Sequence, residues 1–202
     1  MRRTDFLKAS PPMFKSPWLD RLTRVHPAVP VLIYLPAIAI LLLVGGPRAG
    51  ALNSIALVLG GYAVWTLTEY WLHRTFFHWV PNTSWGPRMH FFVHGVHHDW
   101  PDDRYRLVMP PAVSGTLFVL FMAIFYALLG GVWMFPFYSG FVFGYTVYDC
   151  THYATHHFKP RSARLKWFKR LASHHMNHHF QHKPRKYGVS TTLWDHVFGT
   201  YV

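Results

Sequence analysis

Histidines are the residues of this sequence best suited to chemistry, because they gather in four short clusters. The chain has 16 histidines in 202 residues. Imidazole nitrogen is a common ligand for zinc, iron, copper and nickel in proteins. The four clusters are HRTFFH (73–78), HFFVHGVHH (90–98), HYATHH (152–157) and HHMNHH (174–179).

The spacing within these clusters favours metal binding. On an α-helix, residues three or four positions apart lie on one face. We expect three sets to converge in this way: His94, His97 and His98; His152 and His156; and His175, His178 and His179. The pair His73 and His78 is five positions apart, so it requires a helix that ends or widens between the two residues.

Ten converging imidazoles indicate two metal ions, because one ion binds about four to six ligands. A di-iron site of the carboxylate type needs several Glu residues in ExxH spacing. The only Glu in this chain is Glu69, so the predicted site is nearly all nitrogen. A histidine-rich metal-buffering tract is an alternative, but such tracts are usually low-complexity runs. These clusters are separated by aromatic sequence.

Three acidic residues are placed to support the histidines. Neutral imidazoles leave the charge of two divalent ions uncompensated, and carboxylates often hold the outer N–H group of a ligating ring. Glu69, Asp99 and Asp149 each lie within four positions of a clustered histidine. We expect them to hold ring N–H groups, the alternative for each being a surface salt bridge.

The elements that must position these residues are four apolar stretches, at about 28–46, 51–72, 112–129 and 132–148. Each is near the roughly 20 residues that a membrane-spanning helix needs. Glycines at 45–50 and 130–131 separate them by short turns, which predicts two helical hairpins. The composition is 51% hydrophobic and 14% charged, whereas a soluble domain carries about 25% charged residues.

We therefore predict an all-α integral membrane protein with four transmembrane helices and a helical cap that holds a histidine-rich dimetal site. Residues 1–26 are expected to form a cytoplasmic N-terminal segment, and residues 27–202 one membrane domain. The cap comprises residues 73–111 and 149–202.

The basic residues predict the orientation in the membrane. The formal net charge is +12, and every Lys and Arg except Arg48 lies outside the two hairpin turns. The positive-inside rule makes that side cytoplasmic, so both the N-terminal segment and the cap with its metal site are expected there. Topology thus accounts for the charge, and we expect no nucleic-acid partner. Cys150 is the single cysteine, which excludes an internal disulfide and a CxxC metal site.

Longer motifs resemble the membrane fatty acid hydroxylase and sterol desaturase superfamily, whose members carry HxxxxH, HxxHH, HxxxH and a second HxxHH on a four-helix membrane domain. The motifs are HGVHHDWPDDRYRLVMPP (94–111), YDCTHYATHH (148–157) and HHMNHHFQHKPRKYGVSTTLWDHVFGT (174–200). The resemblance covers roughly residues 66–200. Within the superfamily the sequence is most similar to the fatty acid 2-hydroxylases, which act on ceramide-linked acyl chains.

The resemblance implies a set of metal ligands, one for each matching motif position: His73, His78, His94, His97, His98, His152, His156, His175, His178 and His179. It implies four neighbouring histidines that support the ligands: His90, His157, His174 and His182. The choice of His175 over His174 rests on the HxxHH spacing. Tyr148 and Asp149, at the end of the fourth stretch, are candidate catalytic residues, and Tyr148 is a candidate to line the acyl-chain slot.

The resemblance further implies an O2-dependent, di-iron monooxygenase that hydroxylates a free or sphingolipid-linked fatty acyl chain, most readily at C2. The cofactors would be two Fe ions, with Zn possible in purified protein, and O2. The N-terminal segment of residues 1–26 is short, and His26-Pro27 lacks the glycines of a b-type haem motif. We therefore expect electrons from a separate b-type cytochrome or ferredoxin-like protein. The membrane would be the inner membrane of a bacterium or the endoplasmic reticulum of a eukaryote.

Two alternatives remain open from the sequence. One is oxidation of another lipid on the same scaffold: hydroxylation or desaturation of a sterol, a carotenoid or a lipid head group. The other is a non-catalytic metal carrier or transporter. A carrier would need polar residues along a path through the membrane, and the first and third apolar stretches contain almost none.

Overall fold

The computed structural model describes residues 2–181 and 185–202, and the regular secondary structure in those residues is entirely helical. The elements are α1 (Arg3–Leu7), α2 (Pro17–Leu22), α3 (Val29–Ala49), α4 (Ala51–Trp71), the π-helix η1 (Leu72–Phe77), α5 (Gly86–His90), the π-helix η2 (Phe91–Gly95), α6 (Val96–Asp99), α7 (Pro111–His157), the 3-10 helix η3 (Ala163–Leu165), α8 (Lys166–Phe180) and α9 (Leu193–Val197). The chain divides into two units, each built from segments distant in sequence.

The first unit comprises Ala28–Thr68 and Met109–Asp149 and is called here the helical unit. It contains α3 and most of α4 and α7. Within the described part of the chain, three helical stretches are long and apolar enough to cross a membrane: Val29–Ala49, Ala51–Phe77 and Pro111–His157. In the third, Gly130 has non-helical backbone angles (φ 75°, ψ 169°), so α7 consists of two helical parts.

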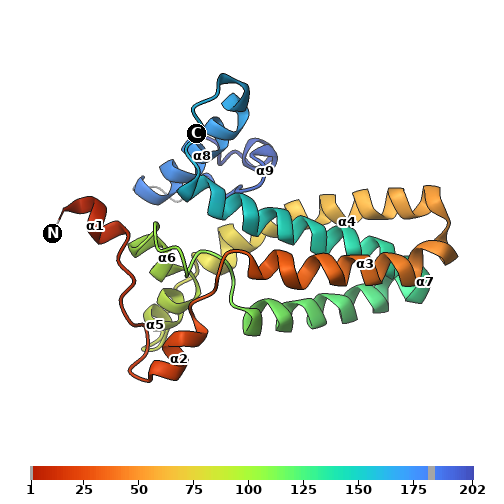
Figure 1. Ribbon diagram of the computed structural model, residues 1–202, viewed down its shortest axis with the longest axis horizontal. Coiled ribbons are helices and arrows are strands. Elements are labelled where there is room, and N and C mark those ends of the chain that lie inside the picture. The colour runs from red at the N-terminus through yellow and green to blue at the C-terminus, as the bar shows by residue number, and fades with distance from the viewer. Residues whose placement is uncertain (1, 182–184) are drawn as a thin grey trace. The chain divides into compact units, whose positions relative to one another are not determined.

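The two parts of α7 pack side by side (Figure 1). Ring centroids of Phe118 and Tyr138 lie 5.1 Å apart, and the hydroxyl of Tyr138 donates a hydrogen bond to the carbonyl of Phe118 at 2.5 Å. A positive φ suits glycine, which has no Cβ to clash. Gly130 therefore makes the turn of a helical hairpin at the position where the sequence predicts one.

Glycines let α4 and the second part of α7 approach closely. A Cβ atom on Gly140 would lie 2.0 Å from the carbonyl oxygen of Val58, and one on Gly61 would lie 1.9 Å from that of Phe137. Small residues at such contacts are typical of helix pairs in membranes, where van der Waals packing drives association.

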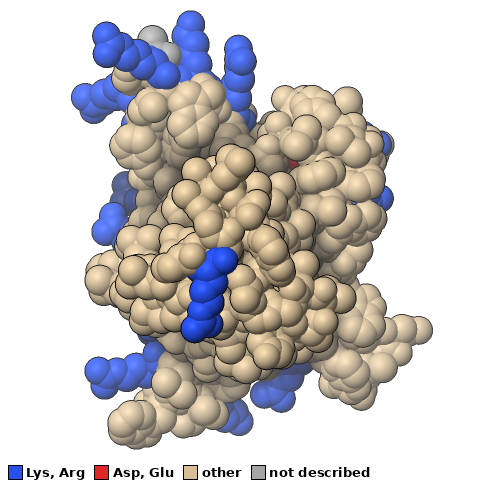
Figure 2. Space-filling model, turned by 90° about the vertical axis from the view of Figure 1, so that its right-hand side faces the viewer, with Lys and Arg blue, Asp and Glu red and all other residues tan. Residues whose placement is uncertain are grey.

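The surface of the helical unit suits hydrocarbon. Leu32, Leu43, Leu52, Leu59 and Leu128 are each at least 64% exposed. Figure 2 shows broad areas without charged residues on the face that it presents. Exposed apolar area of this extent marks a surface that contacts lipid or protein.

The second unit, called here the cap, comprises the described residues of Met1–Pro27, Glu69–Val108 and Cys150–Val202. Its N-terminal segment is tied to the loop that follows α6. The Arg106 side chain is 3% exposed and pairs with Asp20 at 2.9 Å and with Asp103 at 3.4 Å. The N–H of Val25 donates to the carbonyl of Tyr105 at 2.7 Å. All the clustered histidines of the described residues belong to this unit.

Candidate metal centre

Ten histidine side chains of the cap converge in two groups of five, and within each group one ring nitrogen per residue lies within 4.8 Å of the others. The first group is His73, His78, His94, His98 and His178. The second group is His97, His152, His156, His175 and His179. These are the ten residues that the sequence motifs imply as ligands.

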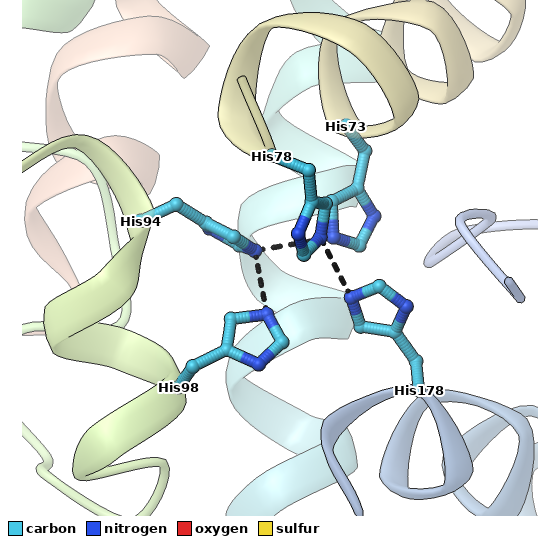
Figure 3. Close-up of side chains that lie close together, drawn as sticks. All are labelled: His73, His78, His94, His98 and His178. Atoms are coloured by element: carbon cyan, nitrogen blue, oxygen red, sulfur yellow. Dashed lines mark hydrogen bonds between the residues drawn. The ribbon is translucent and has the colours of Figure 1, made fainter. Parts of the chain in front are cut away.

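The first group brings together residues from three separate segments (Figure 3). The Nε2 atom of His94 lies 3.2 Å from that of His73 and 3.0 Å from that of His98. The Nε2 atoms of His78 and His178 lie 2.9 Å apart. The rings thus present the same nitrogen to a common centre.

The second group has the same construction. Nε2 atoms lie 2.9 Å apart for His152 and His97, 3.0 Å for His175 and His156, and 3.1 Å for His179 and His175. His175 is fully buried, with no exposed surface. Seven of the ten histidines are buried, and His78, His98 and His179 are half-buried.

Helix geometry explains which histidines meet. The π-helix η1 (Leu72–Phe77) widens the chain between His73 and His78, so residues five positions apart reach one group. The sequence predicted this end or widening. In a π-helix the hydrogen bonds run from residue i to i+5, and such turns are frequent at functional sites.

The sequence predicted that the three histidines of each HxxHH motif would converge, but the structure divides them between the two groups. His94 and His98 join the first group, whereas His97 between them joins the second. Likewise His175 and His179 belong to the second group and His178 to the first. In each motif the first and last histidines are four positions apart and join the same group. The middle histidine, three positions after the first, lies on the opposite flank of the same helical face, so it joins the other group.

The nitrogen spacing fits metal ions. A zinc or similar divalent ion binds imidazole nitrogen at about 2.0–2.1 Å, so two ligands at right angles are about 2.8–3.0 Å apart. The observed Nε2 separations of 2.9–3.2 Å match that spacing closely. Five nitrogen donors leave a six-coordinate ion one further position.

The histidines are held in the neutral form that binds metal. Burial, with the neighbouring histidines, lowers the pKa of His98 and of His78 from 6.5 to about 3. Burial likewise keeps the pKa of His94, His97 and His175 well below the usual value. A buried cluster of imidazolium ions would be very unfavourable, so these rings are unprotonated at neutral pH.

Two rings of the first group are oriented by backbone carbonyls. Nδ1 of His73 donates to the carbonyl of Tyr187 at 2.5 Å, and Nδ1 of His178 donates to that of Arg185 at 2.6 Å. Glu69, expected to hold a ring N–H, instead accepts the backbone N–H groups of Val189 and Ser190, each at 2.8 Å. Its carboxylate therefore acts on the loop beside the histidines.

The remaining predicted neighbours are spread around the site. Nε2 of His174 donates to Asp195 at 3.0 Å, away from both groups. His90 lies near His78, with ring centroids 6.4 Å apart, and His157 packs against Tyr153 with the two rings tilted at 41°. Asp99 is exposed, and His182 lies outside the described residues.

Tyr148 and Asp149 belong to the helical unit. The Asp149 side chain is buried and accepts a hydrogen bond from the Tyr145 hydroxyl at 2.7 Å. Tyr148 is buried and packs on Trp65, with ring centroids 5.9 Å apart.

Asp195 is a site residue that the spacing of histidines did not single out. It has no exposed surface and accepts from His174, from Thr200 at 2.7 Å and from two backbone N–H groups at 2.8 Å. Burial raises its pKa, but the hydrogen bonds outweigh that effect and leave the pKa below 3.8. The only signal in the sequence was the match of Trp194-Asp195 to the family motif, which carries no geometry.

Comparisons with known proteins agree with this site. The family model for fatty acid hydroxylase matches residues 58–200. The chain is 37% identical over 192 residues to the dihydroceramide fatty acyl 2-hydroxylase FAH2 of Arabidopsis thaliana, covering 94% of this chain and 79% of that protein. It is 38% identical over 202 residues to the ceramide very long chain fatty acid hydroxylase SCS7 of Saccharomyces cerevisiae, covering 96% of this chain but half of that protein.

The fold agrees as well. The solved structure described as full-length scs7p, with only the hydroxylase domain visible, superimposes with a TM-score of 0.85 at 36% identity. The match covers 92% of this chain and 70% of that chain. With the motifs, the fold and the family model in agreement, this chain belongs to the fatty acid hydroxylase family.

Proposed function

We propose that the protein is a fatty acid 2-hydroxylase that uses O2 to hydroxylate C2 of a fatty acyl chain, free or sphingolipid-linked. The observation that carries the proposal is the convergence of ten histidine Nε2 atoms into two five-nitrogen groups in a chain of this family. The acyl chains named for the plant and yeast relatives, those of dihydroceramide and ceramide, support the substrate class. No observation favours a sterol, a carotenoid or a metal-carrier role.

The ten histidines would hold two iron ions. Iron supplies the redox chemistry that O2 activation requires, whereas zinc has none, although imidazole sites also accept zinc. The reaction consumes O2, two electrons and two protons, replaces one C–H bond by C–OH and releases water. The electrons would come from a separate carrier protein of the b-type cytochrome or ferredoxin class.

The protein's own residues prepare the site. Burial keeps the imidazoles neutral, so that ten nitrogen lone pairs remain available without loss of protons on binding. Backbone carbonyls fix the ring orientation of His73 and His178. Burial of seven of the ten rings limits access of water, which would otherwise quench a reactive oxidant.

The apolar helices and the family together identify an integral membrane protein. We propose that α3, α4 and the two parts of α7 make four spans, because Gly130 divides α7 into lengths of about one span each. The distribution of Lys and Arg along the sequence supports a cytoplasmic site. An acyl tail among the spans would then present a carbon near its head group for oxidation.

Tyr148 and Asp149 are proposed to act where the acyl chain enters, at the end of the fourth span. Both are buried. Tyr148 would line the acyl slot, and Asp149, which holds the Tyr145 hydroxyl, would fix the polar end of that slot.

The test is a lipid analysis of cells that express the protein under 18O2. The wild type is expected to add one 18O atom at C2 of acyl chains, and His94→Ala is expected to abolish that product. His196→Ala is the matched control, because His196 is exposed and lies outside both groups. Labelled oxygen on a sterol or head group, with C2 unlabelled, would replace the proposal by the alternative on the same scaffold.

A further inference from the structure

The loop of residues 185–190 supplies the two carbonyls that orient the first histidine group. A carbonyl can only accept, so Nδ1 of His73 and Nδ1 of His178 each carry the hydrogen in these contacts. A neutral ring with its hydrogen on Nδ1 has a bare Nε2. The loop therefore selects, at both residues, the tautomer whose free lone pair faces the cluster.

The backbone of this loop is fixed along its whole length. The N–H of Lys186 donates to the carbonyl of Thr200 at 3.0 Å. Asp195 accepts the next two N–H groups, those of Tyr187 and Gly188, and Glu69 accepts the following two, all at 2.8 Å. Five successive N–H groups thus have a fixed acceptor, and Lys186 is held at φ 65°, a conformation that side-chain-bearing residues rarely adopt.

The two carboxylates that hold the loop are themselves deeply buried. Asp195 has no exposed surface and Glu69 is 3% exposed. Neither accepts a hydrogen bond from a histidine of the first group in the described contacts; each acts through the loop. Burying a carboxylate is costly unless hydrogen bonds compensate. Four donors contact Asp195 and three contact Glu69.

The second histidine group lacks this support. The Nδ1 atoms of His97, His156, His175 and His179 are buried and have no hydrogen-bond acceptor among the residues that the structure describes. One carboxylate oxygen of Asp102 lies 4.0 Å from Nδ1 of His156, beyond hydrogen-bond distance. The two groups therefore differ in how firmly the protein holds their ligands.

We propose that the loop of residues 185–190 is a clamp for the first metal position, and that Asp195 and Glu69 are positioning residues that set metal affinity there and not at the second position. The inference rests on the two-ion site of the proposed function. It goes further in making the two positions unequal and in naming the side chains responsible.

The experiment measures zinc affinity of the purified full chain by titration against a competing chromophoric chelator. Two backgrounds isolate the positions. Replacing His97, His156 and His175 by Ala leaves five nitrogens in the first group and two in the second, and replacing His78, His94 and His98 by Ala leaves five in the second and two in the first. Asp195→Asn is then introduced into each background, because Asn turns one accepting oxygen into a donor that faces the loop N–H groups.

We expect Asp195→Asn to weaken zinc binding about 10- to 100-fold in the background that retains the first group, the range typical for loss of a residue that orients a metal ligand. Binding in the background that retains the second group should stay unchanged. Asp103→Asn is the matched control: Asp103 is also a buried carboxylate of the cap, but it pairs with Arg106 and Ser10. It should change neither affinity.

Glu69→Gln tests the clamp independently of Asp195 and should give the same one-sided loss. Equal weakening at both positions, or none at either, would overturn the proposal. Loss of the helical circular dichroism signal in both carboxylate variants would assign these residues to folding and would also overturn it. A wild type that binds no pair of ions would instead refute the dimetal site of the proposed function.

Discussion

The Nε2 atoms of His78 and His178 lie 2.9 Å apart although 100 positions separate the two residues in the chain (Figure 3). Because Nδ1 of His178 donates to the Arg185 carbonyl, its Nε2 is bare in the neutral ring. Five such nitrogens within 4.8 Å bring several lone pairs together. A shared cation removes that repulsion, so metal binding and folding of the cap should be coupled.

The adjacent residues His174 and His175 should behave differently on substitution. His175→Ala removes one nitrogen of the second group and should reduce the zinc bound per chain from two ions toward one. His174→Ala should keep both ions but lower the free energy of unfolding by about 1–3 kcal/mol, because buried Asp195 loses a hydrogen-bond donor. Mass spectrometry measures the zinc bound per chain in each variant, and denaturant titration measures the free energy of unfolding. Equal metal loss in both variants would show that HxxHH spacing does not distinguish the ligand from its neighbour.

Acid should destabilise the metal-free protein before most carboxylates titrate. The pKa of His78 and of His98 is about 3 in the fold and 6.5 in the unfolded chain, so only the unfolded chain takes up these protons between those values. Stability is thus fully present above pH 6.5 and declines as the pH falls toward 3.

Thermal denaturation of the metal-free protein from pH 7.5 to 4.5 measures this decline. His78→Asn with His98→Asn should flatten the dependence of Tm on pH, whereas His196→Asn, at an exposed position, should leave the slope as in the wild type. A double variant as steep as the wild type would contradict the assignment.

Arg106→Ala should strongly destabilise the cap. Its side chain is 3% exposed and pairs with Asp20 and Asp103, so its removal leaves buried Asp103 without its cation and Asp20 with Arg24 alone. Breaking a buried ion pair from one side costs about 3–5 kcal/mol. Chemical denaturation followed by circular dichroism measures the loss. Arg104→Ala is the control, because Arg104 is exposed, and should change stability by less than about 0.5 kcal/mol.

Gly140→Ala should loosen the helical unit. The added methyl group would lie 2.0 Å from the Val58 carbonyl oxygen, so α4 and the second part of α7 must separate. We expect a loss of about 1–3 kcal/mol, the usual cost of overpacking, measured as a lower unfolding temperature in detergent. Gly115→Ala has open space around its Cβ and should be neutral or slightly stabilising. Equal effects of the two substitutions would rule out the close contact as the cause.

The spacing of residues within short stretches of the sequence predicted much of the site. The four clusters identified all ten residues that converge, because metal-compatible spacing is a property of a few consecutive residues. The HxxxxH spacing even required the helix to widen between His73 and His78, and the π-helix η1 lies there. Glycine at position 130 predicted the turn within α7, since its missing side chain permits a positive φ.

The role of the acids could not be predicted locally. Glu69 lies four positions before His73, which suggested a direct contact with that ring. The structure instead places residues 189 and 190 against its carboxylate. Sequence proximity gives a distance along one helix, but it says nothing of a loop more than 100 positions away that competes for the same oxygens.

By itself, then, the sequence predicted an all-helical chain with long apolar helices, a convergence of ten histidines and the family to which the chain belongs. Only the tertiary structure decided how ten histidines divide into two sets of five and why the middle histidine of each HxxHH motif changes sides. It also decided that Asp195 and the loop carbonyls orient the rings. The physical reason is that periodicity fixes which face of a helix a side chain occupies, whereas its partners depend on how distant segments pack.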